Sequence, residues 1–157
     1  MVKIKNSINK KQSNYSAKYL IFMFSILFNL AFSQSGKLII SGVFDGPLSG
    51  GTPKGVELFV REAITDLSKY AVGSANNGGG TDGPEYTGMS GSASAGSFIY
   101  LTANATEFST FFGFAANYET NEVNINGDDA IELFYDASGN FSGSESVIDV
   151  YGDINVD

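Results

Sequence analysis

Two groups of oxygen-bearing side chains in this sequence have a spacing that could do chemistry. The first is the acidic pair Asp128-Asp129, which directly follows the turn dipeptide Asn126-Gly127. As metal ligands, the two carboxylates would suit Ca²⁺, which takes about six to eight oxygen ligands. As structural groups, they would accept hydrogen bonds from free N–H groups of the turn. We interpret Asn126, Gly127, Asp128 and Asp129 as structural, and keep both aspartates as candidate calcium ligands.

The second group is Asp136-x-Ser138-x-Asn140, which alternates oxygen side chains like the first half of an EF-hand loop. The glycine expected at the sixth position is Phe141, and the glutamate expected at the twelfth is Ile148. The pattern therefore favours a hairpin loop, with Asp136 and Asn140 as candidate calcium ligands.

Two glutamates occupy equivalent places in two similar segments. Glu57 and Glu132 each lie in a V/I-E-L-F pattern, at residues 55–60 and 130–135. Paired carboxylates can hydrolyse glycosides, but only at set separations across a cleft. Alternation along a strand puts each glutamate opposite its aliphatic neighbours, where a solvated carboxylate is ordinary. We interpret both as structural and expect the two segments to be strands of one core.

The missing residue types restrict the chemistry further. The 157-residue chain contains no His, no Cys and no Trp. It therefore has no Ser-His-Asp triad, no Cys-His pair, no zinc site with His ligands and no disulfide. We expect no catalytic residue and no cofactor apart from the candidate calcium.

Residues 1–33 have the composition of a secretory signal peptide. Five lysines precede an apolar run at 19–32, and Ala31-Phe32-Ser33 places small residues before a cleavage site. The apolar run is shorter than the ~20 residues that span a bilayer. We predict cleavage, a mature domain at 34–157, and a secreted or cell-surface location reached through the periplasm of a Gram-negative bacterium.

The predicted mature domain is strongly acidic. Four basic residues remain against 17 acidic ones, a net charge of −13. Such a surface repels nucleic acid and anionic lipid. We therefore expect a protein or glycan partner at the cell surface, no nucleic acid and no membrane association after cleavage.

The elements that must position these residues are short strands. Strands are predicted at residues 37–44, 56–61, 70–74, 97–102, 122–125, 130–135 and 146–151, with a short one near 86–89. Residues 45–55 are predicted to be a loop, and Ile64 and Leu67 to tuck beneath the sheet. This spacing is typical of an all-β sandwich or barrel.

One short helix is predicted at 104–113, with Asn104 as N-cap and Gly113 just past its end. Phe108, Phe111 and Phe112 form a stripe on one helix face, which we interpret as a plug over an open end of the core. The segment 75–96 is low in aliphatic residues and rich in glycine, and is predicted to be a long flexible loop; the alternative is a ligand-binding loop with residues 78–80 as its hinge.

Four stretches, in order, carry a family resemblance. They are L-I-I-S at 38–41, G-V-E-L-F at 55–59 with D-L-S-K-Y at 66–70, G-S-F-I-Y-L at 96–101, and N-G-D-D-A-I-E-L at 126–133 with V-I-D-V-Y-G at 147–152. Together they resemble a bacterial lamin tail domain, and the leader resembles those of the Bacteroidetes group. The resemblance implies an immunoglobulin-like β-sandwich without an active site of its own. The family pattern continues with a further aromatic-rich strand, so we expect either that this chain is a fragment of a longer protein or that its sandwich lacks the last strand.

Three functions follow as hypotheses. The first is a non-catalytic structural or interaction module of a secreted or cell-surface protein. The second is a calcium-dependent adhesion or carbohydrate-binding module, suggested by the acidic charge and the oxygen-rich turns. The third is an accessory domain of a secreted nuclease or phosphoesterase whose catalytic part follows Asp157, since such modules accompany these enzymes in the family that the chain resembles.

Overall fold

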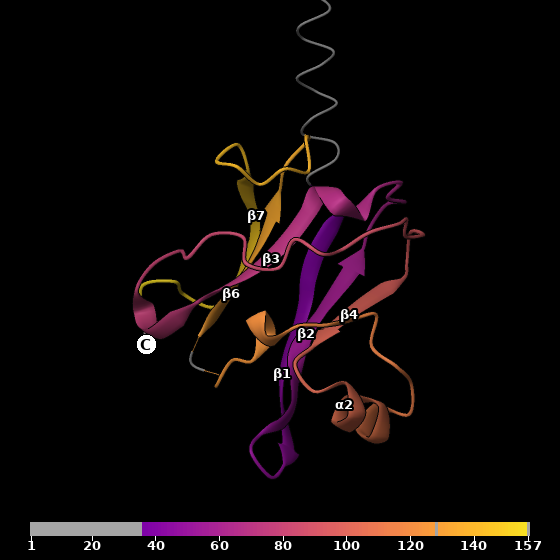
Figure 1. Cartoon of the computed structure of the whole chain (residues 1–157), viewed down its shortest axis with the longest axis vertical. Helices are drawn as coiled ribbons and strands as arrows, with labels where there is room; N and C mark the ends of the chain where they lie inside the picture. The colour runs from indigo at the N-terminus through magenta and orange to yellow at the C-terminus, as the bar shows by residue number, and fades with distance from the viewer. Residues whose placement is uncertain (1–35, 128, 157) are drawn as a thin grey trace, which may run out of the picture. The chain divides into compact units, whose positions relative to one another are not determined.

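The computed structural model describes residues 36–127 and 129–156, which belong to the unit Ser35–Asp157. The predicted signal peptide and Asp128 lie outside the described residues. Within the described part, seven strands form two sheets, ordered β1-β2-β4-β5 and β3-β6-β7 (Figure 1). The strands are β1 (Leu38–Leu48), β2 (Thr52–Val60), β3 (Tyr70–Ala75), β4 (Phe98–Thr102), β5 (Tyr118–Glu119), β6 (Ala130–Tyr135) and β7 (Ser146–Tyr151). The all-β sandwich predicted from the sequence is confirmed.

The core lies between the two sheets and is built by strand alternation. Val56, Leu58 and Val60 of β2 face it and are fully buried, as predicted. Ile131 and Leu133 of β6 meet them from the second sheet in the same apolar cluster. The two V/I-E-L-F segments are therefore strands of one core, because each turns its aliphatic side chains inward. Asp149 of β7 also joins the sheets, since its Oδ2 accepts a hydrogen bond from Ile40 N of β1 at 2.8 Å.

The loop predicted at 45–55 is wrong. β1 and β2 continue through this region as one hairpin, with Asp45 opposite Lys54 and Leu48 opposite Thr52. The turn itself needs only three residues, because Gly50 and Gly51 adopt φ angles of 84° and 71°. Glycine and proline indicated a loop, whereas antiparallel pairing keeps both arms of the hairpin extended.

The strand predicted at 122–125 is also wrong. Residues Asn121–Val123 form a 3-10 helix, η3, and Thr120 begins it by accepting a hydrogen bond from Glu122 N. Val123 and Ile125 are nevertheless buried in the core. The apolar spacing correctly indicated burial but not backbone conformation, because a capped turn can bury the same two side chains. The sequence did not predict β5, which pairs in parallel with the end of β4.

The long loop between β3 and β4 is fastened to the sandwich. Ile64 and Ala93 exchange two backbone hydrogen bonds of 2.8 Å, and Leu67 N donates to Gly91 O at 2.8 Å. Met89 is buried in the core, and the strand expected near 86–89 is reduced to a single bridge at Tyr86. Ile64 and Leu67 are buried, as predicted. The sequence did not predict the pairing of Ile64 with Ala93, because the glycine content of the loop indicated flexibility.

The same loop covers the outer face of β3 and β6. The backbone of Gly83 lies directly against Gly73, leaving no room for a side chain there. Gly73 is the cross-strand neighbour of Glu132. The expectation that Glu132 is solvated is therefore wrong: its side chain is 1% exposed, and Oε2 forms no hydrogen bond with the described residues. Alternation placed it away from the core, but this outer face is itself covered.

A methyl group at Gly73 tests this covering contact. We expect Gly73→Ala to lower the free energy of unfolding by about 1–3 kcal/mol, because the new Cβ overlaps the Gly83 carbonyl oxygen. Gly36→Ala is the matched control, since nothing lies within 4 Å of its Cβ position. Chemical denaturation measures both changes, and equal effects would show that the loop does not press on β3.

Helix α2 (Ala105–Phe112) ends at Gly113, whose φ of 79° gives the expected left-handed residue after the helix. Asn104 precedes it but makes no side-chain capping bond to the helix. Phe108 is fully buried, but Phe111 and Phe112 are exposed, so the predicted plug over the core is wrong. Phe108 instead packs on the side of the first sheet opposite the core. It belongs to an aromatic row, which comprises Phe44, Phe59, Phe98, Tyr100, Phe108, Phe112 and Phe114.

Candidate binding site

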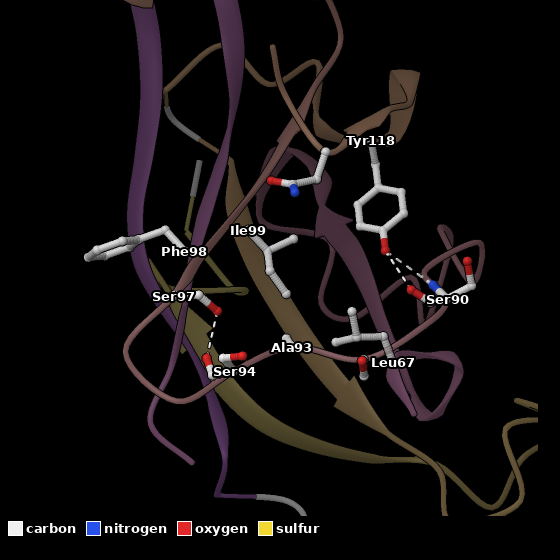
Figure 2. A pocket seen from close by; sticks show the side chains of 10 residues that line it. Leu67, Ser90, Ala93, Ser94, Ser97, Phe98, Ile99 and Tyr118 are labelled. Carbon is white, nitrogen blue, oxygen red and sulfur yellow. Dashed lines mark hydrogen bonds between the residues drawn. The ribbon is translucent and has the colours of Figure 1, made fainter. Parts of the chain in front are cut away.

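A hollow of about 260 Å³ opens between the long loop and the edge of the first sheet (Figure 2). Four serines line it, namely Ser90, Ser92, Ser94 and Ser97, and we call it the serine pocket. Its apolar floor comes from Leu67, Ala93 and Ile99, which also belong to the core or pack against it. The loop anchors at Ala93 and Gly91 hold the serines in place, because both bond to the segment before β3.

Most of the serine hydroxyls in the pocket are unused. Ser97 Oγ donates to Ser94 O at 2.6 Å. The hydroxyls of Ser90, Ser92 and Ser94 form no hydrogen bond with any other described residue, and all three residues are exposed. Each hydroxyl can both donate and accept. The pocket therefore presents several free hydrogen-bonding groups to a ligand.

The opposite wall is formed where β5 begins. Asn117 takes both backbone groups of Tyr100: its N donates to Tyr100 O at 3.0 Å, and its Oδ1 accepts from Tyr100 N at 2.8 Å. Asn117 Nδ2 bonds to none of the described residues, so two donor hydrogens remain free. The Tyr118 ring stands beside it, held by a bond from its hydroxyl to Ser90 O at 3.0 Å. Tyr86 packs against this ring, with centroids 6.0 Å apart.

Phe98 contributes to the pocket differently. Figure 2 shows its ring pointing away from the other lining side chains, and the ring packs against Tyr100 of the aromatic row, with centroids 6.4 Å apart. Backbone hydrogen-bonding groups alternate along a strand, so the amide groups of Phe98 point to the same edge as those of Tyr100. Phe98 thus lines the pocket with its backbone, and its exposed ring lies on the other side of the sheet.

No charged side chain lines the serine pocket. This is unusual on a chain with 17 acidic residues. A cation would find no carboxylate there, and an anion would meet the repulsive field of the whole domain. The lining therefore suits a neutral, hydrogen-bonding ligand.

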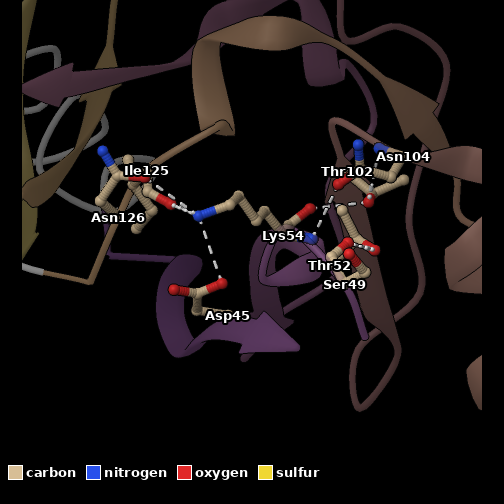
Figure 3. Close-up of polar contacts among 8 residues, drawn as sticks. All are labelled: Asp45, Ser49, Thr52, Lys54, Thr102, Asn104, Ile125 and Asn126. Carbon is tan, nitrogen blue, oxygen red and sulfur yellow. Dashed lines mark hydrogen bonds and ion pairs between the residues drawn. The ribbon is translucent and has the colours of Figure 1, made fainter. Parts of the chain in front are cut away.

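A second polar cluster is centred on Lys54 of β2 and connects it to β1, to the start of α2 and to the segment 125–126 (Figure 3). The Lys54 side chain is 8% exposed, and its Nζ donates to Ile125 O at 2.6 Å and to Asn126 Oδ1 at 3.2 Å. Nζ also pairs with Asp45 Oδ1 at 3.2 Å. The Lys54 backbone N donates to Asn104 Oδ1 at 3.1 Å, which ties the start of α2 to β2. All three Lys54 ammonium hydrogens are thus directed to protein oxygens, so this cluster is structural.

The described residues of the acidic turn at 126–129 connect neighbouring segments of the chain. Asn126 holds Lys54, and Gly127 has a φ of 88°, which favours glycine. Asp129 Oδ1 accepts from Asn77 N at 3.0 Å and fastens the loop after β3. Asp128 lies outside the described residues.

Asp136 organises the loop between β6 and β7. Its Oδ1 accepts from Ser138 N at 2.8 Å and from Ser138 Oγ at 2.9 Å, and its Oδ2 accepts from Phe141 N at 2.9 Å and from Ser144 Oγ at 3.1 Å. Asn140 is exposed and uses its backbone N to bond Ser138 Oγ. Calcium binding at Asp136 would have to replace these four bonds. The arrangement is that of a closed hairpin loop.

These bonds have a consequence at low pH. Hydrogen bonds from Ser138 hold the pKa of Asp136 below its usual value, and bonds from the Ser68 hydroxyl and backbone do the same for Asp66. A lowered folded-state pKa gives stability that is present above the unfolded value near 4 and is lost as the pH falls through the folded value.

We therefore expect the melting temperature to fall steadily below about pH 4. Asp136→Asn should melt lower at neutral pH and show a shallower decline in acid, because one titrating group has been removed. Thermal melts of both proteins across the acid range measure this. Parallel curves would show that Asp136 does not contribute to the acid response.

Glu57 and Glu132 lie on the outer faces of different sheets, with the core between them. Glu57 Oε1 accepts from Ser41 Oγ at 2.8 Å on the first sheet, beside Tyr100, whose pKa is raised by burial and by this carboxylate. Glu132 lies on the second sheet beneath the long loop. The packed core separates them, so they do not form a catalytic carboxylate pair.

Sequence reasoning missed both the serine pocket and Lys54. The S-G-S-A-S run at 90–94 was a usable signal, because alternate serines in an extended loop point to one side. The alternative considered for this segment, a ligand-binding loop with residues 78–80 as its hinge, directed attention to other residues of the same loop. Nothing local distinguishes Lys54 from a surface lysine, because its partners come from distant positions.

Comparisons with protein-family models, with curated proteins and with solved structures gave no match. Among the described residues, no three carboxylates are arranged to hold a metal ion. The helices in that part of the chain fall short of the length and apolarity needed to cross a membrane.

Proposed function

We propose that this chain is a non-catalytic binding module of an exported bacterial protein, built as a lamin-tail-like β-sandwich. The observation that carries the proposal is the serine pocket, whose lining offers unbonded serine hydroxyls and the Asn117 Nδ2 group but no charged side chain. Enzymatic acid–base or nucleophilic chemistry needs a nucleophile, a base and an oxyanion donor within reach of one another. The pocket instead provides uncharged hydrogen-bonding groups and apolar side chains.

The use of the acidic residues supports the same function. Asp129 and Asp136, which the sequence offered as metal ligands, accept hydrogen bonds that hold loops in place. Asp45 pairs with Lys54. These three carboxylates thus stabilise the scaffold, and the lining of the serine pocket consists of uncharged groups. The partner we propose is a protein or a glycan at the cell surface, and export rests on the leader at 1–33.

Binding and turnover assays on the full chain test the proposal together. We expect the protein to be depleted from solution by washed bacterial envelopes. We expect no hydrolysis of duplex DNA, RNA or p-nitrophenyl phosphate in the presence of Mg²⁺, Mn²⁺ or Ca²⁺. Hydrolysis that is retained through purification and is abolished by Asp128→Asn would overturn the proposal.

A further inference from the structure

We propose that the serine pocket binds one ring of a neutral sugar. This inference rests on the function proposed above and names its ligand class. A pyranose ring carries hydroxyl groups around its edge and apolar C–H groups on its faces. The pocket has the complementary parts, and the following observations connect each part to a feature of the sugar.

The size of the pocket limits the ligand to one ring. Its volume of about 260 Å³ is just below the ~300 Å³ at which sites for drug-sized ligands begin. The hollow lies at the surface, between the loop that carries the serines and the beginning of β5. A longer glycan would place one ring in the pocket and continue over the neighbouring surface.

The polar groups match the hydroxyl edge of a sugar. The Ser90, Ser92 and Ser94 hydroxyls and the Asn117 Nδ2 group can each bond a sugar hydroxyl, and none of these groups has a partner among the described residues. A sugar hydroxyl, like a serine hydroxyl, both donates and accepts hydrogen bonds. It can therefore bond either to the serine hydroxyls or to the amide nitrogen of the pocket wall.

The apolar groups match the ring face. Tyr118 presents an aromatic ring whose orientation is fixed by its hydroxyl bond to Ser90 and by Tyr86 behind it. Leu67 and Ile99 complete an apolar floor. An anchored ring loses little freedom when a ligand packs on it, which reduces the entropic cost of binding.

An extended peptide is the competing ligand, and the sheet edge argues against it. A bound peptide strand would need a row of free backbone groups along β4. Asn117 already occupies those of Tyr100, and Thr120 N bonds Thr102 O at 2.9 Å. Only Phe98 remains on this edge of β4, which is too short for strand pairing.

The test uses the full chain and the methyl glycosides of glucose, galactose, mannose, xylose and N-acetylglucosamine. Backbone amide resonances are followed by NMR during each titration. At least one glycoside should shift resonances of residues 90–94 and 117–118, with a dissociation constant on the order of millimolar for one small ring. Neutral and anionic forms of the same sugar, such as a methyl glucoside and its glucuronide, should differ by at least about tenfold because of the acidic field.

Two variants with a matched control locate the binding. Ser92→Trp fills the pocket and should abolish the shifts, whereas Ser49→Trp, at an exposed serine of the β1–β2 turn, should leave them unchanged. The double variant Ser92→Ala/Ser94→Ala keeps the space but removes two hydroxyls, and should weaken binding by roughly tenfold. Melting curves establish that all three remain folded.

Each contrary result has a defined meaning. The sugar proposal is overturned if no glycoside shifts the pocket residues, if Ser49→Trp and Ser92→Trp act alike, or if the glucuronide binds as well as the glucoside. Shifts caused by tetra-alanine but by no glycoside would assign the pocket to peptide. In all these cases envelope binding without turnover would leave the broader function standing, so the two failures can be distinguished.

Discussion

Replacing Lys54 by methionine is expected to lower the free energy of unfolding by about 3 kcal/mol. Methionine keeps the apolar stem but removes the ammonium that bonds Ile125 O, Asn126 Oδ1 and Asp45 Oδ1. The Ile125 carbonyl is then left in a buried site without its donor, and buried acceptors without partners are costly. Urea denaturation of the wild type and of the variant measures the loss.

Asp45→Asn is the control for this prediction. The Asp45 side chain is 35% exposed, so water screens its pair with Lys54 and the expected loss is about 1 kcal/mol or less. The asymmetry between the two partners is the important result. If both substitutions cost the same, the ion pair rather than the buried carbonyl contact would be the source of the stability.

The second large effect is expected at the aromatic row. Phe108→Ala should cost about 3 kcal/mol, because Phe108 is 0% exposed and packs against the rings of Phe44, Tyr100, Phe112 and Phe114. Its removal leaves a cavity between α2 and the first sheet. Denaturation with guanidinium measures the change through the transition midpoint.

Phe111→Ala is the matched control on the same helix. The Phe111 side chain is 49% exposed, and among the described aromatic rings it packs against that of Phe112, so a loss of about 0.5 kcal/mol or less is expected. A loss equal to that of Phe108→Ala would mean that the whole stripe packs as the sequence suggested, and that α2 lies differently on the sheet.

Strand positions were the most predictable part of this fold. The segments around Glu57 and Glu132 were placed correctly because period-two alternation of aliphatic residues depends only on local sequence. The burial of their core-facing side chains was predictable from this pattern, but the burial of their outward-facing side chains was not. Glu132 is covered by a loop whose path depends on Gly83 meeting Gly73, a contact between residues with no side chains and hence no apolar signal.

The helix shows the same limit. Its ends at Asn104 and Gly113 were readable from residue type, and its stripe of Phe108, Phe111 and Phe112 was real. Which of the three rings is buried depends on how an eight-residue helix rests on the sheet. That orientation is fixed by Asn104 bonding Lys54 N, fifty residues away, and no local pattern reports it.

The candidate site was the least predictable part. Sequence reasoning directed attention to acidic turns because carboxylates are recognisable ligands, and the structure shows Asp129 and Asp136 engaged within the scaffold. The serine pocket forms because Tyr118 bonds Ser90. This contact brings the segment at 117–118 against the distant loop that carries the serines. Serine and asparagine are common loop residues, so only their convergence distinguishes them.

The Tyr118–Tyr86 pair gives the pocket a built-in optical reporter. The chain has eight tyrosines and no tryptophan, so its ultraviolet emission has no indole contribution and is dominated by the phenol groups. One of the pair lines the pocket wall and the other stands behind it. An occupant that displaces water from Tyr118 would change the intensity of that emission, and occupancy could be followed in an unlabelled sample at dilute concentration.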